Sequence, residues 1–100
     1  SMLQYWKYLQ TTMNHFEFIN EINKDISPID CAASVEQNEQ VYYLVITPSD
    51  KLKGIDWDSS GISLMFDVIV KRHTVFQSKE QKNGQISYKL GTLFDFLKEA

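Results

Sequence analysis

Apolar residues at the start of the chain recur with the spacing of an α-helix. In the stretch "MLQYWKYLQTTMNHFEFINEINKDI", steps of 4, 3, 4 and 3 residues separate the members of one register, which are Met2, Trp6, Leu9, Met13 and Phe16. Side chains spaced in this way line one face of a helix. Pro28 cannot continue a helix and favours extended geometry at the residue before it. The pattern therefore predicts a long N-terminal helix that ends at Ser27 and Pro28.

A second apolar register runs beside the first one. Its members are Tyr5, Tyr8, Ile19, Ile22 and Ile26. Together the two registers cover roughly 200° of the helix circumference, whereas one core-facing stripe needs roughly 100°. Two explanations are open. Either the helix is covered on two sides, or it breaks near Phe16 to Phe18 and its two halves face different neighbours.

The rest of the chain is rich in residues that favour strands, with turn signals between them. "CAASVEQ" and "QVYYLVIT" bracket Asn38-Glu39 and predict a hairpin over residues 31–47. "ISLMFDVIVKRHTVF" is dense in β-branched and aromatic residues and predicts one long bent strand or two strands. "KNG" at 82–84 predicts a turn, and "QISYKL" predicts a last strand.

Within this region, the segment from Ile62 to Val70 is expected to form a central strand of the sheet. A charge at Val68 would then be buried without a partner and would be severely destabilising. At the end of the chain, Thr92 and Asp95 match a capping box that opens a short helix in "LFDFLKEA". The expected fold is α+β, in one domain over residues 1–100, with a long N-terminal helix, an antiparallel sheet of four to five strands and a short C-terminal helix.

Composition narrows the class of protein without identifying it. The chain is 43% hydrophobic and 23% charged, which is too apolar for a disordered segment. Its net charge of −3 argues against a generic nucleic-acid binder. The lone Cys31 cannot form an internal disulfide and favours a reducing, intracellular compartment, cytoplasm or nucleus. The opening Ser1-Met2, followed at once by helical pattern, suggests a domain excised from a longer protein.

The stretch "GIDWDSSGISLMFD" partly matches a calcium-binding loop. Asp56, Asp58, Ser60, Gly61 and Asp67 occupy its positions 1, 3, 5, 6 and 12. Such a loop normally lies between two helices and ends in Glu, and this stretch meets neither condition as interpreted. We expect a β-turn in which Asp and Ser side chains accept backbone N–H groups, with no metal and no cofactor.

The chain offers few groups for catalysis. Cys31, His15 and His73 lie in no nucleophile motif, and no phosphate-binding loop or zinc-ligand spacing is present. His15 is interpreted as a surface residue of the first helix. The sequence therefore favours a non-catalytic protein.

Basic residues accumulate in the second half of the chain. They are Lys71, Arg72, His73, Lys79, Lys82 and Lys89. If neighbouring strands gathered them, with Lys71 and His73 on one strand face, the patch would suit an anionic membrane or an acidic peptide. In that alternative the anion-binding residues are Lys71, Arg72, His73 and Lys89. Lysines on strand edges also simply discourage aggregation, which is the plainer interpretation.

Surplus aromatic residues suggest a partner surface. Tyr and Trp are enriched where proteins bind one another. The wide apolar face of the first helix predicts a protein-interaction module that binds a protein partner or a second copy through Tyr5, Trp6, Tyr8 and Leu9. A further alternative is a small toxin-neutralising protein whose acidic first half, with two lysines against seven acids, forms the binding face. The expected order of elements is similar to that of kinase-associated C-terminal domains and, more loosely, of RWD-type domains of kinetochore proteins.

Overall fold

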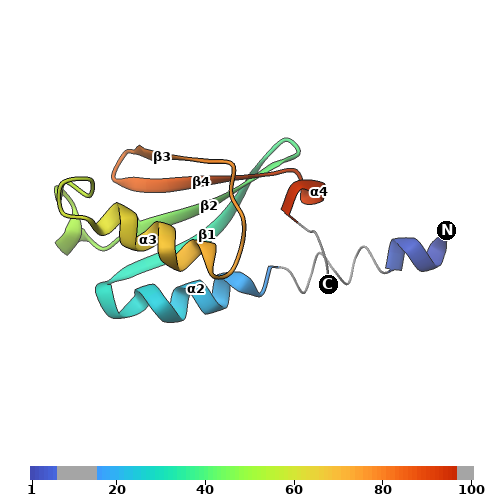
Figure 1. The fold of residues 1–100 in the computed structure, drawn as a ribbon, viewed down its shortest axis with the longest axis horizontal. Coiled ribbons are helices and arrows are strands. Elements are labelled where there is room, and N and C mark those ends of the chain that lie inside the picture. The colour runs from blue at the N-terminus through green and yellow to red at the C-terminus, as the bar shows by residue number, and fades with distance from the viewer. Residues whose placement is uncertain (7–15, 97–100) are drawn as a thin grey trace.

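The computed structural model describes residues 1–6 and 16–96 of the chain (Figure 1). A short helix covers residues 2–6. The later elements are α2 (Phe18–Ile26), η1 (Ser27–Ile29), β1 (Cys31–Asn38), β2 (Val41–Pro48), η2 (Asp50–Leu52), α3 (Ile62–Lys71), β3 (Ser78–Lys82), β4 (Gln85–Gly91) and α4 (Leu93–Phe96). The fold is α+β, as the sequence predicts.

The four strands of the described region form one antiparallel sheet in the order β1-β2-β4-β3. The predicted hairpin over residues 31–47 is confirmed as β1 and β2, and its turn is at Glu39, whose φ is 57°. The predicted turn in "KNG" is also confirmed, since Asn83 and Gly84 both have positive φ and join β3 to β4. Positive φ at both central residues is typical of the two-residue turns that suit the twist of a hairpin.

The N-terminal helix differs from the one expected. Residues 2–6 are helical, residues 16–17 form a turn, and α2 begins only at Phe18 and has 9 residues. The break near Phe16 to Phe18 was one of the two explanations for the over-wide apolar face. Phe16 packs against Tyr42 at a ring-centroid distance of 5.6 Å, whereas Ile22 and Ile26 on α2 are fully buried in the core. Phe16 is partly buried against the same core cluster as Ile22 and Ile26, so the two registers are not divided between two neighbours. The helix does break, however, and a single long helix is not what the structure shows.

The expected central strand over residues 62–70 is wrong, because this segment forms α3. Gly61, at φ 78°, occupies the residue before the helix, and the buried side chains of α3 recur at helical spacing. Phe66 and Val70 are both fully buried. Packing of this stripe on the sheet outweighs the strand preference of Val and Ile, which is weak and depends on context. Val68 points away from the core and is 53% exposed, so the burial from which a severe cost of a charge was expected is also wrong.

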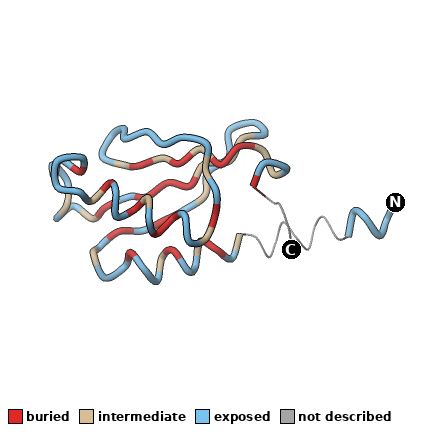
Figure 2. The backbone as a smooth tube through the Cα atoms, viewed as in Figure 1, coloured by how far each residue is buried: buried red, intermediate tan, exposed pale blue. Residues whose placement is uncertain are grey.

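Helices α2 and α3 both cover one face of the sheet (Figures 1 and 2). Alternate residues of a strand point to opposite faces. On β2, Leu44 and Ile46 belong to the core cluster that contains the buried residues of both helices, and on β4 Ile86 and Tyr88 do the same. The other face carries mostly polar side chains, such as Thr47 and Gln85, which are hydrogen-bonded to one another at 2.9 Å. The fold is thus a two-layer α+β structure with helices on one side.

The two outer strands of the sheet are protected in different ways. On β1, the Asn23 side chain of α2 accepts a hydrogen bond from the Ala33 N–H at 2.7 Å and donates one to the Ala33 carbonyl at 3.0 Å. It therefore replaces a neighbouring strand at that point. On β3, every residue of the segment from Ser78 to Lys82 is exposed, and the strand carries charges. Charged side chains on an edge strand discourage pairing with another sheet.

Candidate interaction surface

The short helix at residues 2–6 has apolar side chains that the described structure leaves in solvent. Met2, Leu3, Tyr5 and Trp6 are between 57% and 79% exposed. Tyr5 and Trp6 are two of the four residues for which partner binding was expected. The other two, Tyr8 and Leu9, lie outside the described residues, as does His15. We call residues 2–6 the N-terminal segment.

The outer side of α3 is a second exposed apolar surface. Leu64, Met65 and Val68 are 38% to 69% exposed. Leu64 and Val68 are four residues apart, so they are neighbours on one side of the helix. A helix on the surface of a soluble protein normally presents polar residues to water. We call these three residues the α3 outer surface.

A cavity of about 310 Å³ lies beside this surface, at the beginning of α3. Its apolar lining comes from η1, η2, the loop after η2, and α3: Ile29, Leu52, Trp57, Ile62, Met65 and Phe66. Met65 belongs to both the lining and the α3 outer surface, which makes the two continuous. Asp30, in the left-handed region at φ 59°, and Cys31 complete the wall.

The thiol of Cys31 is nearly enclosed in this wall. Cys31 is 6% exposed, and its Sγ donates to the Ile29 carbonyl at 3.6 Å. Burial, and then the negative charge of Asp30, raise the pKa of the Cys31 thiol. A thiol with a raised pKa is a poor nucleophile at neutral pH, because the thiolate is the reactive form. The geometry therefore gives Cys31 no catalytic activation.

Asp67, the twelfth position of the calcium-loop match, bonds within the fold. Its Oδ1 accepts from the Tyr88 hydroxyl at 2.8 Å, and its Oδ2 accepts from Lys79 Nζ at 2.7 Å. Lys79 Nζ also donates to Ser63 Oγ at 2.7 Å. Tyr88 is fully buried, and its pKa is strongly raised by burial and then by the hydrogen bond to Asp67. These four residues, which we call the Asp67 cluster, join α3 to β3 and β4.

The Asp67 cluster lacks the features of a catalytic dyad. Ser63 and Lys79 are within hydrogen-bond distance, but Lys79 Nζ donates to Ser63 Oγ and to Asp67 Oδ2, both at 2.7 Å. In this arrangement the amine is a hydrogen-bond donor to the serine and not a base that accepts its proton. Ser63 is 5% exposed, and it does not line the cavity at the beginning of α3. The geometry is that of an attachment between helix and sheet.

The rest of the calcium-loop match is a turn, as the sequence predicts. Asp56 Oδ1 accepts from the N–H groups of Asp58 and Ser59 at 3.2 and 3.3 Å, and its Oδ2 accepts from the Ser59 hydroxyl at 2.7 Å. These hydrogen bonds from Ser59 lower the pKa of the Asp56 carboxyl. Asp67 lies on α3 and is engaged elsewhere. That the stretch does not bind calcium remains a prediction.

The basic residues do not share one strand face. Lys71 ends α3, and Arg72 and His73 follow it in a turn, so the expected strand arrangement of Lys71 and His73 is wrong. Lys89 follows Tyr88 on β4, and since Tyr88 reaches Asp67 on α3, Lys89 points to the opposite face of the sheet. Anion binding by Lys71, Arg72, His73 and Lys89 stays a prediction, and it would have to use two separate surfaces.

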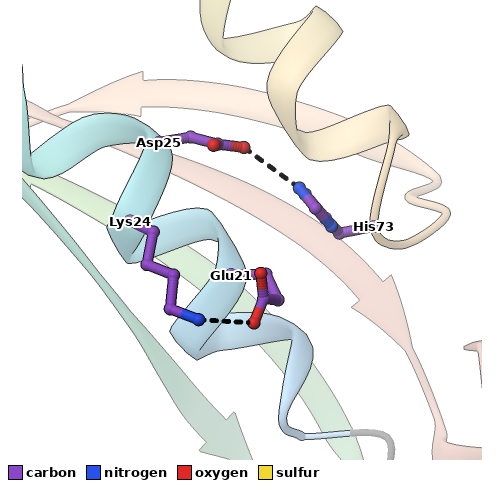
Figure 3. A network of polar contacts seen from close by, with 4 residues as sticks. All are labelled: Glu21, Lys24, Asp25 and His73. Carbon is purple, nitrogen blue, oxygen red and sulfur yellow. Dashed lines mark hydrogen bonds and ion pairs between the residues drawn. The ribbon is translucent and has the colours of Figure 1, made fainter.

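Besides Lys79, the basic residues His73 and Lys71 also have intramolecular contacts. His73 Nε2 is 3.1 Å from Asp25 Oδ2, which joins the end of α3 to α2 (Figure 3). Lys71 Nζ lies 5.7 Å from the centre of the Phe76 ring. On the same side of α2, Lys24 pairs with Glu21 at 3.0 Å (Figure 3). The outer side of α2 is therefore occupied by charges and their pairs.

The described part of the chain contains neither a candidate metal centre nor a candidate membrane-spanning helix. Residues 1–6 and 16–96 contain no group of three or more His, Cys, Asp or Glu side chains placed to hold a metal ion. Within the same residues, no helix has the length and apolarity to cross a membrane. Comparison of the chain with protein-family models, with curated proteins and with solved structures finds no match.

The sequence interpretation missed the α3 outer surface and the cavity. A signal for the helix was present, because Ile62, Phe66, Ile69 and Val70 follow one another at steps of 4, 3 and 1 residues. Those steps are typical of a helix, but the high content of Val and Ile was given more weight. The cavity had no comparable signal, since segments far apart in the chain form its wall.

Proposed function

We propose that this chain is a non-catalytic protein-interaction domain that binds a protein partner through the N-terminal segment, and that the partner to be tested first is a second copy. The observation that carries the proposal is the exposure of Met2, Leu3, Tyr5 and Trp6. An apolar side chain in water gains roughly 1.5–3 kcal/mol when it is buried. Four such side chains on one short helix favour association with an apolar surface.

The composition of the segment supports protein binding. Tyr and Trp carry a large apolar area with few rotatable bonds, and both are enriched among residues that dominate binding energy. The state of the possible catalytic side chains in the described residues also supports a non-catalytic domain. The pKa of the Cys31 thiol is raised, and Lys79 Nζ donates hydrogen bonds to both Ser63 Oγ and Asp67 Oδ2.

The test is self-association of the full chain, measured by light scattering at increasing concentration. Replacing Tyr5 and Trp6 together by Glu should abolish association, because two charges would have to be buried without partners. The melting temperature should not change, since both side chains lie in solvent. Gln4→Glu is the matched control, because it adds a charge to the same helix at a polar, exposed residue.

Two results would contradict binding to a second copy. One is a wild-type chain that stays monomeric at several hundred micromolar. The other is a double variant that associates as strongly as the wild type. A double variant that unfolds would instead place Tyr5 and Trp6 in the core, against their exposure in the structure.

A further inference from the structure

We infer that the receptor for the N-terminal segment is the cavity at the beginning of α3 together with the α3 outer surface, and that the segment which occupies it comes from a second copy of the chain. The inference rests on the proposed function, because it names the surface that the segment would bind. Binding would be reciprocal: each copy inserts its segment into the cavity of the other. Such an exchange satisfies the two-fold symmetry that most small homo-oligomers adopt.

Chemical complementarity is the first argument. The segment presents two aromatic and two aliphatic side chains, and the receptor presents a cavity with a largely apolar lining beside exposed Leu64 and Val68. A volume of about 310 Å³ has room for a large aromatic side chain such as that of Trp6. An amphipathic helix that lays its apolar side on an apolar groove is a recurring mode of protein recognition.

Charge is compatible with this arrangement. Of the described residues that line the cavity, Asp30 alone is charged. Residues 1–6 contain no acid, and Lys7 follows them in the sequence. The segment can therefore approach Asp30 without bringing two negative charges together. A strongly acidic segment would be disfavoured at the same place.

The position of the segment favours a second copy over the same chain. In Figure 1 the N-terminal segment lies at one end of the long axis, and the beginning of α3 and the end of α2 lie towards the other. The long axis measures 50 Å. The segment is therefore remote from the cavity of its own chain in this structure. A neighbouring copy can offer its cavity without any change in either fold.

The area buried also favours reciprocal exchange. An aromatic side chain buries about 150–250 Å² in all, and Tyr5 and Trp6 still expose more than half of theirs. One segment in one cavity therefore makes a small contact. Two such contacts, with the aliphatic side chains and the receptor surfaces included, approach the roughly 1,200–2,000 Å² of a stable interface. One-sided binding would bury about half of this area and should be correspondingly weaker.

Complementation between two variants of the full chain tests the inference. Leu64→Glu with Val68→Glu damages only the receptor, and Tyr5→Glu with Trp6→Glu damages only the segment. Each variant alone should associate at least about tenfold more weakly than the wild type, because charges replace apolar contacts. In an equimolar mixture, one intact segment meets one intact receptor, so light scattering should detect partial recovery of dimer.

Disulfide trapping gives a second readout, and it locates the segment. Cys31 is the single cysteine and lines the cavity. Leu3→Cys places a thiol three residues from Trp6, on the same side of the helix. Oxidation at alkaline pH, where the buried thiol ionises, should give a covalent dimer on a non-reducing gel. Gln4→Cys, which projects to a different side, should give less, and Leu3→Cys combined with Cys31→Ser should give no bond between residues 3 and 31.

The outcomes separate this inference from the proposed function. If the segment variant loses association but the receptor variant keeps it, the segment binds elsewhere, so the receptor is wrong and the function stands. A crosslinked monomer would show the segment in the cavity of its own chain and would overturn the second copy as occupant. A wild-type chain that remains monomeric, with no trapped dimer, would overturn both the inference and self-binding.

Discussion

Helices α2 and α3 pack on the same face of the same sheet, but their outer sides differ. Towards the core, both present large apolar side chains: Ile22 and Ile26 on α2, Phe66 and Val70 on α3. Towards solvent, α2 presents Glu21, Lys24 and Asp25, whereas α3 presents Leu64, Met65 and Val68. The inner sides are alike because both helices must exclude water from one core. The outer sides meet no such requirement.

This contrast distinguishes side chains that the core requires from side chains that it does not require. The charged outer side of α2 is the usual solution for a helix on a protein surface, with its polar residues in water. The α3 outer surface adds nothing to the core, and exposed apolar side chains in one place favour association. The apolar residues of the α3 outer surface are therefore the place where the proposed association can be tested without disturbing the core. The predictions below test this contrast, beginning with the largest expected effect.

The largest effect is expected on the inner side of α3. Phe66→Ala should lower the free energy of unfolding by about 3–5 kcal/mol, because it removes a fully buried aromatic side chain and leaves a cavity. Ile22→Ala is the matched change on α2, with an expected loss of about 2–5 kcal/mol. Urea denaturation measures both. Losses below about 1 kcal/mol in either variant would show that the two inner sides are not equally part of the core.

The attachments of the two helices should differ in strength. Asp67→Ala leaves the buried Tyr88 hydroxyl without its acceptor and the Lys79 amine without its carboxylate partner, so we expect a loss of about 2–3 kcal/mol. Asp25→Ala removes the partner of His73 in a more exposed place, and a loss of about 0–1 kcal/mol is expected. Denaturation in urea compares the two. Equal losses in the free energy of unfolding would mean that the two attachments stabilise the fold equally.

Alkaline pH should weaken the α3 attachment in particular. The pKa of Tyr88 is raised in the folded state, so above pH about 10 the unfolded chain releases a proton that the folded chain retains. The contribution of Tyr88 is complete below that pH, and above it stability falls by up to about 1.4 kcal/mol per pH unit. Tyr88→Phe should be less stable at neutral pH but should lack this part of the alkaline slope. The measurement is the free energy of unfolding of the wild type and of Tyr88→Phe, determined by urea denaturation at several pH values. If it fell equally steeply with pH in both proteins between about pH 10 and 11, the assignment to Tyr88 would be wrong.

The smallest effect is expected on the outer side of α3. Val68→Asp should change the stability of the monomer by no more than about 0.5 kcal/mol, because the side chain is 53% exposed. Thermal melting at low concentration, where association is minimal, measures this effect. A loss above about 2 kcal/mol would place Val68 in the core and would remove the contrast between the two helices.

Local sequence signals predicted the hairpin over residues 31–47 and the turns correctly, but not the strand β3. Asn83-Gly84 has residues that adopt positive φ readily, and the structure places both in that region. Thr92 and Asp95 were expected to cap the last helix, and the Thr92 N–H and hydroxyl both donate to the Asp95 carboxylate, at 2.7 and 3.0 Å. These contacts span at most a few residues. The chemistry of neighbouring residues is enough to define them.

Segment 62–71 shows where local signals fail. Val68, Ile69 and Val70 favour strands when propensity is considered alone, yet the segment is a helix because Phe66 and Val70 fill the space over the sheet. The N-terminal pattern failed for a related reason. Helical spacing continued through Phe16, but Phe16 packs with Tyr42 and Phe96, whose ring centroids lie 5.6 and 6.1 Å away. The spacing of apolar residues predicts which of them lie on one face of an element. It does not predict which other elements that face packs against.

The sequence by itself determined the α+β class, the hairpin over residues 31–47, the turn at Asp56 and the apolar character of residues 2–6, because each depends on residues close together in the chain. Only the tertiary structure decided that Asp67 bonds with Lys79 and Tyr88, which are 12 and 21 residues away. It also decided that Ile29, Leu52 and Met65 border one cavity and that Val68 faces outwards. Contacts between distant residues form only when the whole core excludes water, and no short stretch of sequence contains that information.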